Sequence, residues 1–190
     1  MRLRKKDNTL LLFAGIAGAF YFLKRWFDTR TANAATDNLK PQGQADTNFS
    51  YRDAGGYKSK SQFFGFINLA SAEFRVPASI IEGVLWVESA DGNNTTGATA
   101  GEVGIMQIIP STAAYIRTLS PSLAGAQPHI PSNAIRMGTA LLADNFKKLH
   151  SWSKAIIAYN AGTNSPRVNV SNDWYLIRVQ ERIRALYATS

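Results

Sequence analysis

The 190-residue sequence predicts a mainly α-helical domain that follows an apolar N-terminal segment and a polar linker. From Ser61 onward, apolar residues recur at helical spacing, which indicates helices that each bury one face. Three of the expected helices begin at or beside a proline, a residue that the first turn of a helix tolerates. No run of alternating apolar and polar residues is long enough for a real sheet. These observations favour an almost entirely helical domain.

Residues 1–27 are predicted to form a basic N-terminus and a membrane anchor. An apolar run, TLLLFAGIAGAFYFL, follows the basic start MRLRKKDN and precedes the flank KRWF. About 20 apolar residues are needed to span a bilayer, but a basic and aromatic flank can extend a shorter segment. A cleaved signal peptide is the alternative interpretation, because Ala32-Asn33-Ala34 has the form of a cleavage site. The charged stretch that separates this site from the apolar run favours an uncleaved anchor.

Residues 28–60 are predicted to be a flexible linker, because they are rich in Asn, Asp, Thr, Gln and Gly and contain few apolar residues. Residues 61–190 are predicted to form the folded domain. Its helices are expected to begin, in order, near Phe63, Pro77, Pro110, Pro131, Trp152 and Asp173. The fifth helix is expected to stop at Gly162 and the last to run to Tyr187.

The net charge of +8 is concentrated in the first 60 residues, which hold 11 of the 21 Lys and Arg residues and 5 of the 13 acidic ones. The predicted domain is therefore only weakly basic, which argues against a nucleic-acid-binding protein. A basic N-terminal segment fits an anionic lipid surface. The absence of cysteine excludes disulfides and thiolate metal sites, and two histidines without a carboxylate at ligand spacing argue against a zinc hydrolase.

Glu88 is the candidate catalytic residue. It ends the segment IIEGVLWV, in which apolar residues at helical spacing would bury most of the helix circumference. A polar, glycine-rich loop follows. Desolvation at such a position would keep a carboxyl group protonated toward neutral pH, where it could protonate a leaving oxygen. The ordinary alternative for a single glutamate is a solvated side chain on a helix surface.

Three motifs occur in order: the Glu88-Ser89 pair, the segment GIMQIIPSTA that begins at Gly104, and the segment AYNAG at residues 158–162. In order and approximate spacing, they resemble the soluble-lytic-transglycosylase-like peptidoglycan lyases, which are relatives of goose-type lysozyme. The resemblance covers about residues 61–188. It implies a lysozyme-like helical fold with a cleft between the helix of Glu88 and the AYNAG segment, and it implies neither a cofactor nor a metal.

The resemblance also implies a reaction. Enzymes of this family cleave the β-1,4 bond between N-acetylmuramic acid and N-acetylglucosamine in the peptidoglycan glycan strand. One glutamate, here Glu88, would act first as acid and then as base. The acetamido oxygen of the substrate would support the developing oxocarbenium ion, so that no second carboxylate is required. Deprotonation of the muramoyl C6 hydroxyl would then close a 1,6-anhydro ring in place of attack by water.

The substrate-binding residues that the resemblance implies are Ser89, Thr99, Met106, Gln107, Tyr159, Asn160 and Tyr175. Met106 and Gln107 resemble residues of the cleft floor that touch the sugar. Tyr159 and Asn160 resemble the pair that orients the acid and the acetamido group from the opposite wall. Thr99 keeps a hydroxyl where the family usually has serine, and Tyr175 resembles the tyrosine of the last helix that closes the site. Core packing is the alternative for Met106 and Tyr159.

Asp91 and Glu102 leave a second mechanism open, because either carboxylate could position a water molecule for direct hydrolysis. The protein would then be a goose-type lysozyme-like muramidase; solvated loop side chains are the ordinary interpretation of both residues. A non-catalytic, glycan-binding virion component is a further alternative. The sequence is compatible with two locations: the bacterial inner membrane with the domain facing the periplasmic peptidoglycan, or the membrane of a phage virion, beside other virion proteins that act during phage entry.

Overall fold

The computed structural model describes residues 49, 51, 57–95 and 101–187. The anchor predicted at residues 1–27, most of the predicted linker, and Thr99 lie outside these residues. Within the described ranges, no helix combines the length and the apolar character needed to cross a membrane. The anchor therefore stays a prediction.

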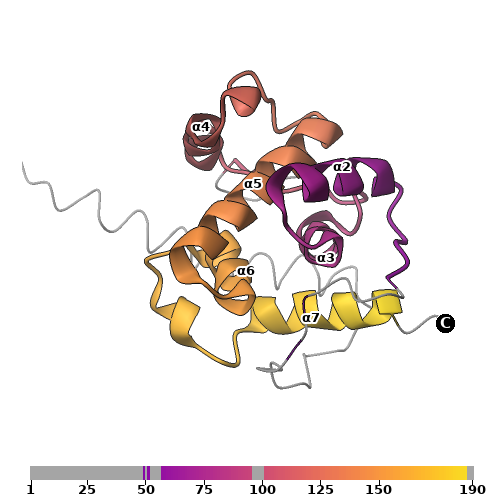
Figure 1. Cartoon of the computed structure of the whole chain (residues 1–190), viewed down its shortest axis with the longest axis vertical. Coiled ribbons are helices and arrows are strands. Elements are labelled where there is room, and N and C mark those ends of the chain that lie inside the picture. Colours follow the sequence, from indigo (N-terminus) through magenta and orange to yellow (C-terminus); the bar gives the residue numbers. More distant parts are fainter. Residues whose placement is uncertain (1–48, 50, 52–56, 96–100, 188–190) are drawn as a thin grey trace, which may run out of the picture.

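The described chain is mainly α-helical, as the sequence predicts (Figure 1). Its elements are, in order, α2 (Phe64–Phe74), α3 (Ala78–Ser89), α4 (Pro110–Leu119), η1 (Pro121–Leu123), α5 (Pro131–Leu149), α6 (Trp152–Ala161), η2 (Pro166–Asn169) and α7 (Trp174–Tyr187). Each of these α-helices begins within one residue of its predicted start. The short 3₁₀ helices η1 and η2 are not predicted, because three or four residues cannot display a helical period.

Helix α3 is the central element of the domain. All of its residues are buried except Trp86 and Glu88, which confirms that the helix carrying Glu88 buries most of its circumference. Figure 1 shows α3 almost end-on, between α2 above and α7 below. Gly83 allows α7 to approach closely, because a Cβ atom at this position would lie only 3.0 Å from Ile183 and 3.2 Å from Val179. The central position of α3 fixes its last turn, where Glu88 lies.

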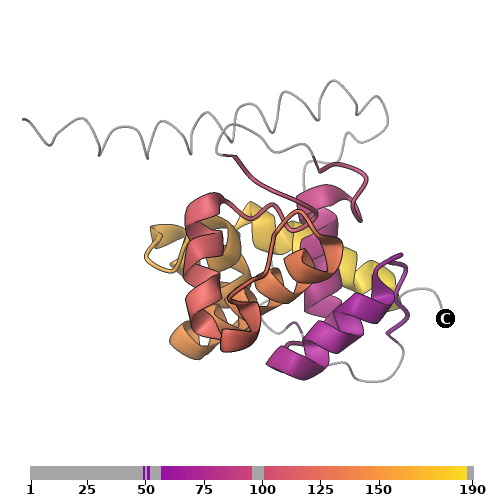
Figure 2. The ribbon, with the colours of Figure 1, turned by 90° about the horizontal axis from the view of Figure 1, so that it is seen from above.

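Helices α4, α5 and α6 complete the core. Figure 2 shows α4 on one side of the domain and α2 with α3 on the other. The long helix α5 lies between them, and it packs on α2, α4 and α6. Its buried residues include Ile135, Met137 and Leu142, all without measurable exposure. Because of this packing, α6, whose C-terminal end carries the AYNAG motif, contributes to the same hydrophobic core as α3.

The folded domain begins earlier in the chain than residue 61. We call residues 57–62 the N-terminal strap. Glu82 of α3, which is completely buried, accepts hydrogen bonds from the hydroxyl groups of Tyr57 and Ser59 at 2.7 and 2.6 Å and from the backbone N–H of Lys60 at 3.0 Å. A buried carboxylate requires such partners. Residues 57–60, which the sequence analysis assigned to a flexible linker, are therefore part of the domain.

Tyr51 extends this correction further toward the N-terminus. It is 8% exposed, and its hydroxyl group accepts a hydrogen bond from Gln180 at 2.7 Å and pairs with the Ser153 hydroxyl at 3.0 Å. The sequence does not reveal these contacts, because an isolated tyrosine in a polar stretch has no periodicity.

Candidate active site

Glu88 occupies the last turn of α3, where its side chain is half-buried. The hydroxyl group of Tyr175 donates a hydrogen bond to Glu88 Oε1, and the O···O distance is 2.5 Å. Tyr175 lies in the first turn of α7 and is 1% exposed. The close packing of α3 on α7 thus brings together two residues that are 87 positions apart in the sequence.

Tyr175 is a permanent hydrogen-bond donor at physiological pH. Burial raises the pKa of its hydroxyl well above the ordinary value of a tyrosine, and the negative charge of Glu88 raises it further. A neutral phenol next to a carboxylate donates its hydrogen rather than losing it. Tyr175 therefore fixes one of the two oxygen atoms of the Glu88 carboxyl group.

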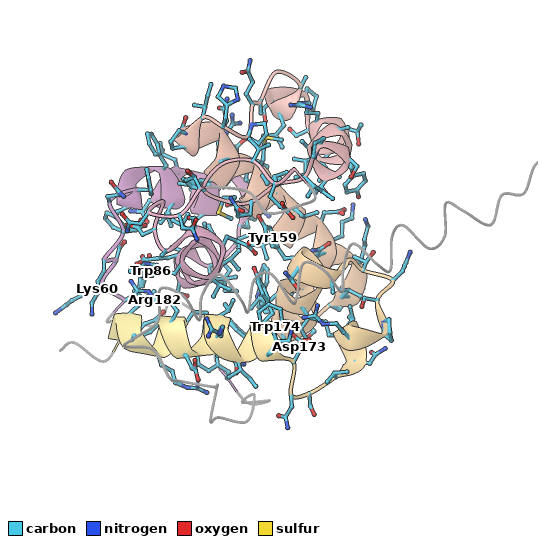
Figure 3. The ribbon with its side chains drawn as sticks, turned by 180° about the vertical axis from the view of Figure 1, so that it is seen from behind. Lys60, Trp86, Tyr159, Asp173, Trp174 and Arg182 are labelled. Atoms are coloured by element: carbon cyan, nitrogen blue, oxygen red, sulfur yellow. The ribbon has the colours of Figure 1, made fainter. Side chains whose placement is uncertain are left out.

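Tyr159 lies near the same carboxylate from α6, and Figure 3 shows it at the centre of the domain. Burial raises the pKa of the Tyr159 hydroxyl well above its usual range, and the charge of Glu88 raises it further. The Tyr159 hydroxyl donates a hydrogen bond to the backbone carbonyl of Met106 at 2.9 Å. The AYNAG motif is thus connected directly to the GIMQ segment.

The GIMQ segment forms a tight hairpin between Val103 and Ile108, whose backbones pair in both directions. The hairpin needs glycine at its first corner: Gly104 has φ +72°, and a Cβ atom there would lie 1.9 Å from the carbonyl oxygen of Pro128. Gln107 adopts φ +47°, which is unusual for a residue with a side chain. Its side-chain amide donates to the Gly104 carbonyl at 2.7 Å, so the predicted sugar ligand also stabilises its own turn.

Met106 and Ser89 are both fully buried. The Met106 side chain packs against α5 at Gly138, where a Cβ atom would lie 2.4 Å from the methionine methyl group. Ser89 donates to the Leu85 carbonyl at 3.2 Å and accepts from the Gly92 backbone N–H at 3.0 Å. These two predicted sugar ligands therefore shape the core and the end of α3, and neither side chain reaches a surface that a sugar could touch.

Asn160 belongs to a polar cluster that also includes Arg167 and Asp173. Arg167 Nη1 donates to Asn160 Oδ1 at 2.9 Å, while Nε and Nη2 donate to the two carboxylate oxygens of Asp173 at 2.8 and 3.1 Å. Asp173 Oδ1 also accepts the backbone N–H groups of Tyr175 and Leu176. Neither Arg167 nor the role of Asp173 was predicted from the sequence. The available signal was an acidic residue directly before a helix, which is typical of an N-cap.

Asp91 is not the solvated loop residue that the sequence suggests. It is 7% exposed, and its carboxylate accepts hydrogen bonds from the Ser61 hydroxyl and from the Gln62 backbone N–H at 3.1 Å. These bonds tie the N-terminal strap to the end of α3. Glu102 is half-buried, and its Oε2 atom is inaccessible and has no hydrogen-bond partner. In the described parts of the chain, no three His, Asp or Glu residues form a group that could hold a metal.

The site thus combines a glutamate in the last turn of the buried helix α3 with two tyrosines, Tyr159 from α6 and Tyr175 from α7. Residues 65–174, more than half of the chain, match the family described as the transglycosylase SLT domain. The chain therefore belongs to this family, which confirms the resemblance seen in its motifs. The chain is 30% identical to the transglycosylase of Enterobacteria phage PRD1 over 129 residues, which are 68% of this chain and 46% of that protein. The chain thus matches about half the length of that relative.

Proposed function

We propose that this protein is a peptidoglycan lytic transglycosylase, in which Glu88 acts first as acid and then as base on the β-1,4 bond between N-acetylmuramic acid and N-acetylglucosamine. The observation that carries the proposal is the hydrogen bond from Tyr175 to Glu88 Oε1. Because the Tyr175 hydroxyl donates to this oxygen, it fixes the orientation of the carboxyl group that is proposed to transfer the proton. Membership of the transglycosylase SLT domain family supports the same reaction.

The atoms of the proposed reaction balance without a water molecule. Glu88 protonates the glycosidic oxygen, the C1–O bond breaks, and N-acetylglucosamine leaves with a free C4 hydroxyl. The acetamido oxygen of the muramoyl residue supports the positive charge at C1. Glu88, now a carboxylate, takes the proton from the C6 hydroxyl, whose oxygen bonds to C1 and closes the 1,6-anhydro ring. The proton thus returns to Glu88, and the enzyme is ready for another cycle.

A single carboxylate is enough for this mechanism, and the contacts of Asp91 support it. The Asp91 carboxylate is hydrogen-bonded to Ser61 and Gln62 in the N-terminal strap, so its oxygens are already used in the fold. Glu102 favours the alternative of a muramidase that hydrolyses the bond, because one of its oxygens has no partner in the described chain. In that case Glu102 would orient a water molecule toward C1.

We also propose that residues 1–27 anchor the protein in a membrane, in the bacterial inner membrane or in that of a phage virion, with the domain facing the peptidoglycan. The apolar run with its basic flanks supports this proposal. Fractionation of the full-length chain tests it. Recovery in the soluble fraction with Ala35 as the N-terminal residue would instead indicate a cleaved signal peptide.

Replacement of the acid tests the proposed reaction. We expect Glu88→Gln to keep the fold and to lower the rate at which purified peptidoglycan sacculi are cleared by two or more orders of magnitude, because the amide cannot transfer a proton. Clearing is followed by turbidity, and the fold by circular dichroism. A Gln variant that clears sacculi at more than about a tenth of the wild-type rate would exclude Glu88 as the acid.

A further inference from the structure

Arg167 lies in η2, between the two helices that supply the tyrosines of the site. It is hydrogen-bonded to one residue before η2 and to one residue after it. Asn160, its partner in α6, directly follows Tyr159. Asp173, its partner before α7, is two residues from Tyr175. We propose that Arg167 is a positioning residue: by holding Asp173, it fixes Tyr175 against Glu88. This inference rests on the proposed function of the same site.

The geometry of the guanidinium group explains why arginine is suited to this position. Nε and Nη2 form a two-pronged contact with both oxygens of Asp173, and Nη1 is directed to Asn160. A planar group with donors in fixed directions can bond both residues at once, which the single ammonium group of lysine cannot do with the same geometry. The Asp173 side chain is only 3% exposed, so without Arg167 its charge would be buried and unpaired.

The orientation of Asp173 determines the first turn of α7. Its Oδ1 atom accepts the backbone N–H of Tyr175 at 3.0 Å and that of Leu176 at 3.3 Å, in the manner of a helix cap. Tyr175 is therefore fixed at its backbone by Asp173 and at its hydroxyl by Glu88. A rotation of the Asp173 carboxylate would move the first turn of the helix and withdraw the hydroxyl from Glu88.

Trp174 adds a second contact between Arg167 and this turn. The guanidinium carbon lies 5.4 Å from the centre of the Trp174 ring, which stands edge-on to the Tyr175 ring at 5.6 Å between centres. Figure 3 shows Trp174 and Asp173 side by side at the beginning of α7. Arg167 therefore supports Tyr175 through a hydrogen-bonded cap and also through its contact with the Trp174 ring, which stands edge-on to Tyr175.

The chain contains a matched control for Arg167. Arg136 of α5 forms the same two-pronged contact with Glu73 of α2, at 2.8 and 2.7 Å. Both arginine side chains are 29% exposed. Arg136 joins α5 to α2, and neither it nor Glu73 is bonded to the helices that carry Tyr159 and Tyr175. Its removal thus reports the loss of a similar two-pronged contact without the link to Glu88, although the Glu73 side chain is 33% exposed and that of Asp173 only 3%.

The test compares Arg167→Ala with Arg136→Ala, each alone and combined with Tyr175→Phe. We expect Arg167→Ala to lower kcat on sacculi at least tenfold, with KM changed less than threefold, and Arg136→Ala to leave both near wild type. Because Arg167 acts through Tyr175, the losses from Arg167→Ala and Tyr175→Phe should not multiply in the double variant. Millimolar guanidinium should partly restore Arg167→Ala. Losses that multiply, or a loss no larger than that of Arg136→Ala, would overturn the proposal.

A measurement without substrate separates this inference from the proposed function. The titration of the Glu88 carboxyl group is followed by carbon NMR in wild type, Arg167→Lys and Arg136→Ala. Tyr159 and Tyr175 face Glu88 and stay neutral over this range, so a midpoint that moves to higher pH only in Arg167→Lys reports a withdrawn Tyr175 hydroxyl. An unmoved midpoint in folded Arg167→Lys would contradict the inference. If wild type released no glycan product, the proposed function would fail, while this titration would still decide the role of Arg167.

Discussion

The hydroxyl group of Tyr175 acts on Glu88 in both steps of the proposed reaction. When Glu88 holds a proton, the hydrogen bond to Oε1 fixes the carboxyl group in one orientation. When Glu88 is ionised, the same hydrogen bond stabilises the negative charge. The raised pKa of Tyr175 keeps the phenol neutral throughout, so this donor remains present when the charge on Glu88 changes.

Removal of this hydroxyl should therefore change the pH dependence as well as the rate. In Tyr175→Phe, the ionised form of Glu88 loses a donor, so the protonated form persists to higher pH. We expect the alkaline limb of the activity profile to move to higher pH and kcat to fall about tenfold or more. Tyr115→Phe is the control, because this exposed tyrosine donates to Asp144 on the surface. An unchanged alkaline limb in Tyr175→Phe would argue against this role.

Asp91 and Glu102, the two carboxylates that leave a hydrolytic mechanism open, should not behave like Glu88. Glu102→Gln is expected to retain most of the activity. Asp91→Asn should also retain it but should lower the free energy of unfolding by about 1–3 kcal/mol, because the hydrogen bonds to the N-terminal strap are weakened. Activity on sacculi and denaturant unfolding measure the two effects. If either variant lost as much activity as Glu88→Gln, a hydrolytic mechanism with two carboxylates would be the better account.

The elements of the domain were largely predictable, because strong local signals mark their starts. Pro110 and Pro131 occupy the first turns of α4 and α5, and the apolar period of α3 shows how deeply it is buried. The N-terminal strap was not predictable. Tyr57 and Ser59 look like residues of a polar linker, but they donate to Glu82, which is far from them in sequence, is buried and needs donors.

The contacts of the strap lead to a prediction about where the domain can be shortened. A chain that begins at Thr47 should be soluble without detergent, as stable as the domain in the full-length protein, and active. A chain that begins at Ser61 loses the donors that Tyr57 and Ser59 give to Glu82 and should unfold at a lower temperature. Thermal unfolding of both chains measures this difference. Equal melting temperatures would mean that the contacts of Tyr57 and Ser59 with Glu82 contribute nothing to stability.

At the scale of the whole molecule, part of the candidate site was also predictable from the sequence and part was not. The resemblance to the family was enough to predict that Glu88, Tyr159 and Tyr175 share one site, and their helices were predicted from clear local patterns. It could not show that the Met106 side chain is buried, since this depends on how the hairpin packs on α5. Nor could it show that Ser89 is buried at the end of α3. Nor could it reveal Arg167, whose partners come from two different elements.

The central claim is that a single carboxylate, Glu88, cleaves the glycan strand without consuming water. The most direct test is to digest purified sacculi with the wild-type domain and to measure the masses of the released muropeptides, with Glu88→Gln as the inactive control. The account predicts products that end in 1,6-anhydro-N-acetylmuramic acid, each lighter by one water molecule than the product of hydrolysis. Muropeptides that instead end in reducing N-acetylmuramic acid would contradict it.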